Sequence, residues 1–172
     1  MTPGSNLMPD GAMDKYTQFS IFLVNKPGVL SGIFRELAKS KINVTCIAMM
    51  DSIEHGVLRM IVEDPEIARP VFQQLSVPVK EADVLGVTLS NRPGAAADLC
   101  DRLAAKHVAI RYMYCTGGAR GGKTIVVLNV PDINKAMRVL ENSKSTRRDM
   151  KVKLRRPSRS AKVSVRHPSR RR

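Results

Sequence analysis

Two short stretches decide the fold of this chain, Asn25-Lys26-Pro27-Gly28 and Asn91-Arg92-Pro93-Gly94. In each, an apolar run rich in β-branched residues ends at the asparagine, and an amphipathic helical pattern follows the glycine. Proline fixes one backbone angle and glycine accepts conformations that other residues avoid, so each stretch predicts a strand-to-helix junction. The first N–H groups of a helix have no partner within it and can hold a carboxylate or phosphate. The two junctions therefore predict two related ligand loops.

The elements around these junctions repeat at a spacing of 66 residues. The first copy predicts a strand over 19–24, a helix over 29–38, a hairpin of strands over 42–50 and 56–62, a helix opened by Pro65, and a closing strand over 77–79. In the second copy the strand 42–50 falls on 108–116, Pro65 falls on Pro131, and residues 150–154 provide the last strand. This repeat predicts two copies of one βαββαβ unit. Packing them edge to edge would join their sheets and cover exposed edges, with the ligand loops at the seam.

Charge separates the body of the chain from its end. Residues 143–172 hold 13 Lys and Arg against one acid, whereas residues 1–142 hold 16 against 14. The predicted organisation is a flexible extension over 1–16, one unit over 17–82, a second over 83–154, and a basic disordered tail over 155–172. Such a tail would bind polyanions through their phosphates, or be a solvated extension without a partner.

The pattern of a strand, Asn-x-Pro-Gly, a helix, Ile-Asn-Val, a hairpin and a second helix resembles the ACT domain, over about residues 17–142. Two such units in tandem resemble stand-alone paired ACT proteins and regulatory small subunits such as that of acetolactate synthase. The resemblance implies an α+β fold of two ferredoxin-like units side by side, with a joined antiparallel sheet and helices on one face. It also implies binding of a small molecule, usually an amino acid, where paired units meet.

By this resemblance, the loop after the first strand of one unit faces the start of the second strand in its neighbour. Asn91 would then face Asn43, whose two amides can pair with the carboxylate and ammonium of an amino acid. At the other seam, Asn25 would face Ala109, which lacks a polar side chain, so the Asn91/Asn43 seam is predicted to bind more strongly. The residues placed in the two seams are Asn25, Pro27, Gly28, Val29, Leu30, Asn43, Asn91, Pro93, Gly94, Ala95, Ala109, Tyr112 and Tyr114.

Each of these assignments has a structural alternative. Asparagine, proline and glycine are common turn residues, so the junctions could serve as turns only. Tyr112 and Tyr114 lie on one strand face and could be core packing instead of ligand contacts.

Several other signals argue against catalysis. Residues 117–124 satisfy the phosphate-loop pattern GxxxxGK[ST], but that site needs a following helix, and the β-branched residues after Thr124 predict a strand. His55, His107 and His167 form no catalytic or metal-binding constellation, and the three cysteines show no ligand spacing. We therefore expect a non-enzymatic protein without cofactor or metal.

The chain has no apolar run long enough to span a bilayer and no signal-peptide pattern, so we expect a cytoplasmic protein that does not bind membranes. The leading hypothesis is a sensor of a free amino acid that assembles as a homo-oligomer. One alternative is a regulatory subunit for a separate catalytic enzyme, and another is a nucleic-acid-associated regulator that uses the tail.

Overall fold

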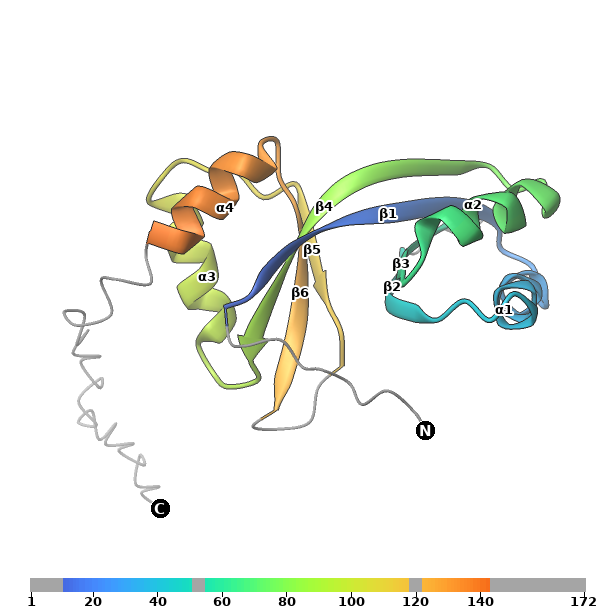
Figure 1. Ribbon diagram of the computed structural model, residues 1–172, viewed down its shortest axis with the longest axis horizontal. Helices are drawn as coiled ribbons and strands as arrows, with labels where there is room; N and C mark the ends of the chain where they lie inside the picture. The colour runs from blue at the N-terminus through green and yellow to red at the C-terminus, as the bar shows by residue number, and fades with distance from the viewer. Residues whose placement is uncertain (1–10, 51–54, 118–121, 143–172) are drawn as a thin grey trace, which may run out of the picture.

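The computed structural model describes residues 11–50, 55–117 and 122–142 (Figure 1). Within these residues the chain forms six strands and four helices. Their order is that of the predicted repeat, except that a single strand replaces the closing strand of the first copy and the opening strand of the second. The elements are β1 (Met13–Val24), α1 (Val29–Lys39), β2 (Val44–Met50), β3 (His55–Val62), α2 (Pro65–Gln74), β4 (Val79–Ser90), α3 (Ala95–Ala104), β5 (Tyr112–Cys115), β6 (Lys123–Asn129) and α4 (Ile133–Asn142).

The strands form one antiparallel sheet in the order β2-β3-β1-β4-β6-β5. Its two central strands, β1 and β4, are each 12 residues long and serve both units. The last part of β1 pairs with β3, and its first part lies beside β4, in the place of a fourth strand for the second unit. The joined sheet is thus confirmed, and the units are joined by shared strands.

Sharing changes three of the predicted boundaries. Residues 13–16, expected in the flexible extension, belong to β1. Of the closing strand expected over 77–79, only Val79 is in a strand, as the first residue of β4. This strand continues to Ser90, so the expected boundary after residue 82 lies inside it. The predicted strand over 150–154, the residues before Gly11 and the basic tail lie outside the described residues.

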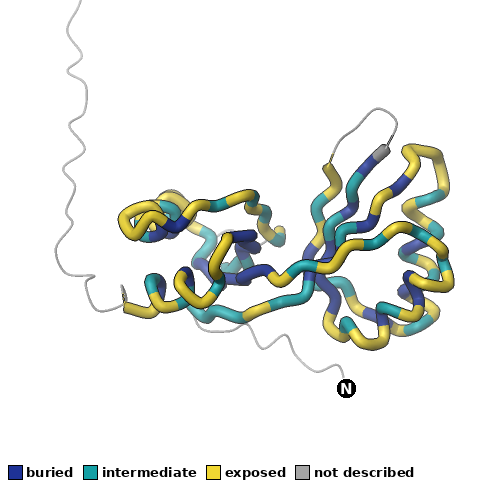
Figure 2. The backbone as a smooth tube through the Cα atoms, turned by 90° about the horizontal axis from the view of Figure 1, so that it is seen from above, coloured by how far each residue is buried: buried dark blue, intermediate teal, exposed yellow. Residues whose placement is uncertain are grey.

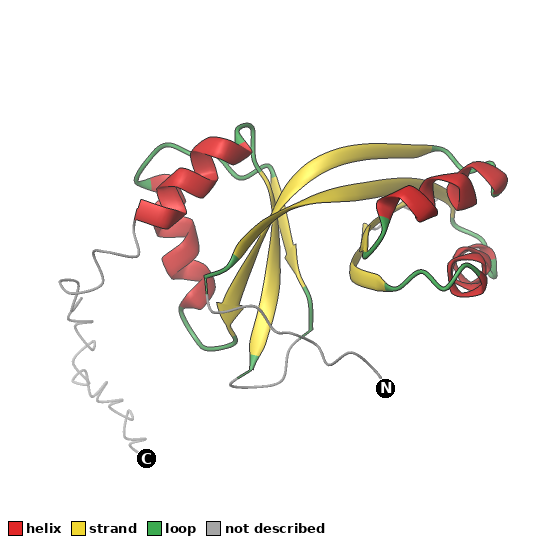
Figure 3. Ribbon diagram, in the orientation of Figure 1, coloured by secondary structure: helices red, strands yellow, loops and turns green. Residues whose placement is uncertain are grey.

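All four helices cover one face of the sheet, as predicted. Phe19 and Ile21 of β1 pack under α1 and α2, whereas Leu85 and Val87 of β4 pack under α3 and α4. Residues opposite each other in an antiparallel pair share a face. The pairings of Met13 with Val87 and of Ile21 with Val79 put both cores on one side of the sheet. Figure 3 shows the helix pairs at opposite ends of the long strands, and Figure 2 shows the buried positions along the strands and the inner sides of the helices.

The sheet curls toward its other face, which we call the open face. A third cluster of buried residues forms there, between the two edges of the sheet. It contains Cys46, Ile61, Val84 and Val127, with Tyr16, Tyr114 and Ile125 packed against it. Its members come from all six strands. The side chains on the open face therefore pack together across the curled sheet.

The junctions have the predicted backbone. Gly28 and Gly94 precede α1 and α3 with φ angles of 90° and 86°. These values lie in the left-handed region, where a β-carbon is unfavourable. The prediction of glycine-dependent helix starts is confirmed.

The second hairpin differs from its prediction. The first strand was expected over 108–116, but only Tyr112–Cys115 pair with β6. The motif GxxxxGK[ST] ends inside β6, because its last two residues, Lys123 and Thr124, are the first two residues of that strand. A phosphate loop needs a helix at that point, so the structure agrees with the rejection of a phosphate loop. Residues 118–121 of the motif lie outside the described residues.

Candidate functional site

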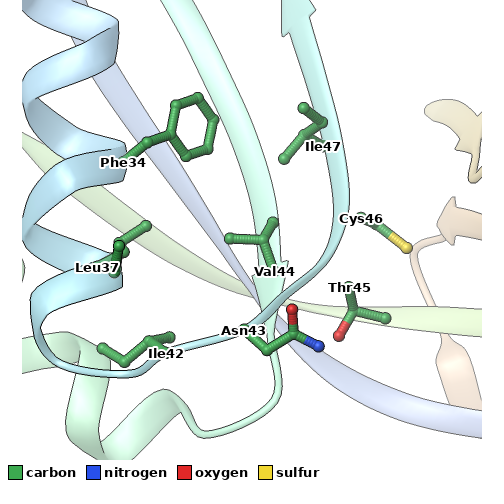
Figure 4. Close-up of a pocket in the computed structure, with 9 residues that line it drawn as sticks. Phe34, Leu37, Ile42, Asn43, Val44, Thr45, Cys46 and Ile47 are labelled. Carbon is green, nitrogen blue, oxygen red and sulfur yellow. The ribbon is translucent and has the colours of Figure 1, made fainter. Parts of the chain in front are cut away.

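A pocket of about 350 Å³ lies between α1 and the edge strand β2. Figure 4 shows Phe34 and Leu37 projecting from α1 on one side and Val44 and Ile47 lying on β2 on the other. The remaining lining residues are Ala38, Ile42, Asn43, Thr45 and Cys46. The pocket is therefore mostly apolar, with one amide side chain at the start of β2.

Asn43 is the one predicted site residue in this pocket, and its orientation is fixed by a charged neighbour. Its side-chain Nδ2 donates a hydrogen bond of 2.7 Å to the Glu63 carboxylate. Its main-chain carbonyl accepts a hydrogen bond of 3.1 Å from the main-chain N–H of Glu63. The amide oxygen of the side chain is thereby turned away from the carboxylate and can accept from a ligand. Glu63 itself is exposed and adds a negative charge beside the pocket.

Sequence reasoning missed Glu63. It lies just after β3, and the hairpin between β2 and β3 places it opposite Asn43. The predicted strand pair 42–50 and 56–62 contained the signal, because extending that hairpin by one residue brings position 63 to position 43.

The two glycine loops lie at opposite ends of the paired strands β1 and β4. These strands are antiparallel, so the loop after Val24 and the loop after Ser90 point in opposite directions (Figure 1). Asn25, Pro27, Pro93 and the two glycines are exposed or half-buried, as is Asn91. At the helix starts, Leu30 is 37% exposed, while Val29 and Ala95 pack against the helix-side cores.

The register keeps the predicted partners apart within one chain. Cys46 near the start of β2 is level with Gln18 on β1 and, through it, with Ala82 on β4. Asn91 follows the end of β4, so it is separated from the level of Asn43 by on the order of 20 Å along the strand. By the same symmetry, the Asn25 loop lies away from Ala109, which is exposed before β5. One chain alone therefore does not bring either predicted pair together.

Tyr112 and Tyr114 lie on the open face, away from both glycine loops. The Tyr112 ring stacks under the Arg59 guanidinium, whose central carbon is 3.7 Å from the ring centre. Both tyrosine hydroxyls hydrogen-bond to the side chain of Gln18, at 3.0 Å and 3.1 Å. This geometry favours the packing alternative for the two tyrosines.

Burial shifts the proton affinities of this region. The pKa of the Cys46 thiol is raised to about 11, mainly by burial and further by the nearby Cys115. Burial also raises the pKa of the Tyr114 hydroxyl, and the neighbouring Cys46 adds to the shift. Both groups are thus protonated and neutral near pH 7.

In the described part of the chain, no three His, Cys, Asp or Glu residues gather in a way that could hold a metal ion. None of the helices described is long and apolar enough to cross a membrane.

Comparison with known proteins identifies relatives of this fold. The profile of the family described as an ACT domain pair matches residues 15–150. The crystal structure of protein BT0572 from Bacteroides thetaiotaomicron is 34% identical, with a TM-score of 0.71 over 77% of this chain and 90% of that chain. No curated protein matches the sequence.

More distant structures share the fold. The ligand-free regulatory subunit of aspartate kinase from Thermus thermophilus is 14% identical, with a TM-score of 0.59 over 80% of this chain and 98% of that chain. Aspartokinase III from E. coli, in complex with lysine and aspartate, is 17% identical, with a TM-score of 0.52 over 84% of this chain and 34% of that chain.

Proposed function

Because this chain belongs to the ACT domain pair family, we propose that it is a non-catalytic regulatory protein that binds a free amino acid. The observation that carries the proposal is the pocket between α1 and β2, with Asn43 in its wall and Glu63 beside it. The Glu63 carboxylate and the amide oxygen of Asn43 suit an α-ammonium group. The apolar wall formed by Phe34 and Ile47 suits an aliphatic side chain.

No lysine or arginine is among the described residues that line the pocket, so the carboxylate of the ligand finds no cationic donor there. We propose that the Asn91 loop of a second copy supplies donors, with Pro93, Gly94 and Ala95 presenting the helix start beside Asn43. The exposed edge of β2 supports assembly with another copy. It has no charged residue or proline, and its Ile47, Met49 and Met50 are 46% to 51% exposed. Edge strands that stay unpaired are usually protected by charged residues or proline, and β2 has neither.

The reciprocal seam joins the Asn25 loop, with Pro27, Gly28, Val29 and Leu30, to Ala109. It lacks an amide opposite Asn25, and we propose that it binds the amino acid more weakly. Two unequal sites in one assembly would allow a response graded with ligand concentration.

The regulated target is a separate catalytic enzyme in this proposal. The T. thermophilus structure that this chain resembles is a regulatory subunit, and the match covers nearly all of that chain. The alternative is that this chain is the regulatory small subunit of a biosynthetic enzyme such as acetolactate synthase. In either case, a ligand that binds one arrangement of the units more tightly shifts the population of the partner complex. Polyanion binding by the basic tail stays a prediction, because the tail lies outside the described residues.

The test is a thermal-shift series with each proteinogenic amino acid, followed by calorimetric titration of any that raises the Tm. Asn43→Ala and Asn91→Ala are expected to lower the affinity by about tenfold each, the effect of losing a hydrogen bond to a charged group. Asn25→Ala should have a smaller effect, and Asn134→Ala, on the exposed side of α4, is the matched control. The proposal is wrong if no amino acid raises the Tm, or if Asn43→Ala binds as the wild type does.

A further inference from the structure

Gln18 is a fully buried polar side chain in the middle of β1, where the second repeat has the apolar Val84. Its Nε2 donates to the Tyr112 hydroxyl and to the Ser20 hydroxyl, both at 3.0 Å. Its amide oxygen accepts from the Tyr114 hydroxyl at 3.1 Å. Buried amides are tolerated when their partners are in place, so Gln18 requires the tyrosines to stay where they are.

These contacts join strands that are not neighbours in the sheet. Gln18 lies on β1 and both tyrosines lie on β5, with β4 and β6 between them in the strand order. The Arg59 guanidinium, on β3, stacks on Tyr112 from the side of the first unit. We call Gln18, Arg59, Tyr112 and Tyr114 the latch. The latch joins strands β1, β3 and β5 across the open face. It thereby fixes the position of the second hairpin, β5 and β6, relative to the first unit.

Strand β2 connects the latch to the proposed ligand pocket. Cys46 lines the pocket, and its buried side chain also packs with Tyr114 in the open-face cluster. Figure 4 shows its sulfur directed away from Phe34 and Leu37. A molecule in the pocket thus lies on one side of β2, and the latch lies on the other.

We infer that occupation of the pocket by an amino acid stabilises the latched arrangement of the two units. The inference rests on the proposed function and adds how that site is regulated. A ligand held against β2 fixes Cys46 against Tyr114, so it binds the closed sheet more tightly than an open one. Coupling between two sites is reciprocal. Opening the latch must therefore lower the affinity for the ligand by the same factor by which the ligand favours the closed latch.

Tyrosine emission reports on the latch. The chain has three tyrosines and no tryptophan, and Tyr16, Tyr112 and Tyr114 all lie on the open face. The experiment measures acrylamide quenching of tyrosine fluorescence in the full chain. The probes are the non-aromatic proteinogenic amino acids, added one at a time. An amino acid that raises the Tm is expected to lower the quenching constant by about twofold, as the closed population rises.

Three variants distinguish loss of the contacts between strands from loss of a hydrogen bond within one strand. Gln18→Leu removes every contact of the amide, and Tyr112→Phe removes one hydroxyl while keeping the ring under Arg59. Ser20→Ala is the matched control, because Ser20 accepts from the same amide but lies on the same strand as Gln18. Gln18→Leu is expected to raise the quenching constant and to weaken amino-acid binding by about fivefold or more. Tyr112→Phe removes one of the three emitting tyrosines, so it is compared by affinity alone and should weaken binding more mildly. Ser20→Ala should bind as the wild type does.

Two results would overturn the inference in different ways. If an amino acid raises the Tm but neither changes the quenching nor binds Gln18→Leu or Tyr112→Phe more weakly, the coupling is wrong and the proposed function stands. If no amino acid raises the Tm of the wild-type chain, the proposed function fails and the inference fails with it.

Discussion

Gly86 of β4 lies directly against the ring of Tyr16 of β1, so closely that a β-carbon at Gly86 would overlap the ring carbons. The tyrosine packs into the open-face cluster through the space that the missing side chain leaves. Gly86→Ala is therefore expected to lower the free energy of unfolding by about 1 to 3 kcal/mol, the usual effect of overpacking. Urea denaturation measures this change.

A double-mutant cycle isolates the contact. In a Tyr16→Ala background the ring is gone, so the added methyl group of Gly86→Ala has room and should cost little. If Gly86→Ala destabilises both backgrounds equally, the ring is not the cause and the packing argument is wrong.

The glycine junctions give a prediction in which two substitutions of the same type have opposite signs. Gly28 precedes α1 with φ of 90°, whereas Gly32 lies within α1, and an added β-carbon would meet nothing within 4 Å at either position. Gly28→Ala should destabilise by about 1 kcal/mol because of its left-handed backbone. Gly32→Ala should stabilise by a similar amount, about 0.8 kcal/mol, through helix propensity. Neither site is crowded, so a difference in sign between the two variants reports the backbone conformation alone. Thermal unfolding of both variants measures it.

Much of this fold could be predicted because its two copies confirm each other. A single Asn-x-Pro-Gly junction has the composition of an ordinary turn. Its recurrence at Asn91, with the helix and the hairpin in phase, requires a shared architecture. The helices, the paired units and the strand after Lys123 follow from local patterns, and all are present.

The shared strands could not be predicted in the same way. In the middle of the β1 and β4 ladder, Lys15 forms a 2.7 Å ion pair with Asp83, and Thr17 lies opposite Asp83. The two helix-side cores lie toward the ends of this ladder, so its middle can be polar and does not show a strand pattern. Pairing between the two long strands overrides the local signal there.

The candidate site was predicted only in part for a related reason. Asn43 lines the pocket as expected, but Glu63 and the latch depend on contacts between distant residues. Gln18 meets its tyrosine partners across 94 and 96 positions of the sequence. No periodicity within β1 indicates that a buried glutamine has such partners.

The start of α2 offers a local test. The Asp64 carboxylate accepts hydrogen bonds from the N–H groups of Glu66 and Ile67, at 3.1 Å and 3.3 Å, and Pro65 follows it. Asp64→Ala should lower the free energy of unfolding by about 1 kcal/mol, and Asp64→Asn should retain most of the capping. Equal destabilisation by both, measured by urea denaturation at pH 7, would contradict capping as the cause.

Alkaline pH should destabilise the fold through the open-face cluster. The pKa of Tyr114 is raised above its ordinary value of 10.0, and that of Cys46 is raised from 9.0 to about 11. A raised pKa means that the folded chain keeps a proton that the unfolded chain has lost, so unfolding becomes easier as pH increases. The contribution of Cys46 is fully present below about pH 9 and is lost as the pH rises toward 11, and that of Tyr114 begins to be lost above about pH 10.

Urea denaturation at intervals from pH 7 to pH 11 checks this dependence. Tyr114→Phe cannot ionise at this position, so its free energy of unfolding should fall less steeply than that of the wild type above about pH 10. The variant should also be less stable at pH 7, because the hydroxyl no longer donates to Gln18. Parallel curves for the two proteins above pH 10 would show that the burial of Tyr114 does not govern the alkaline loss of stability.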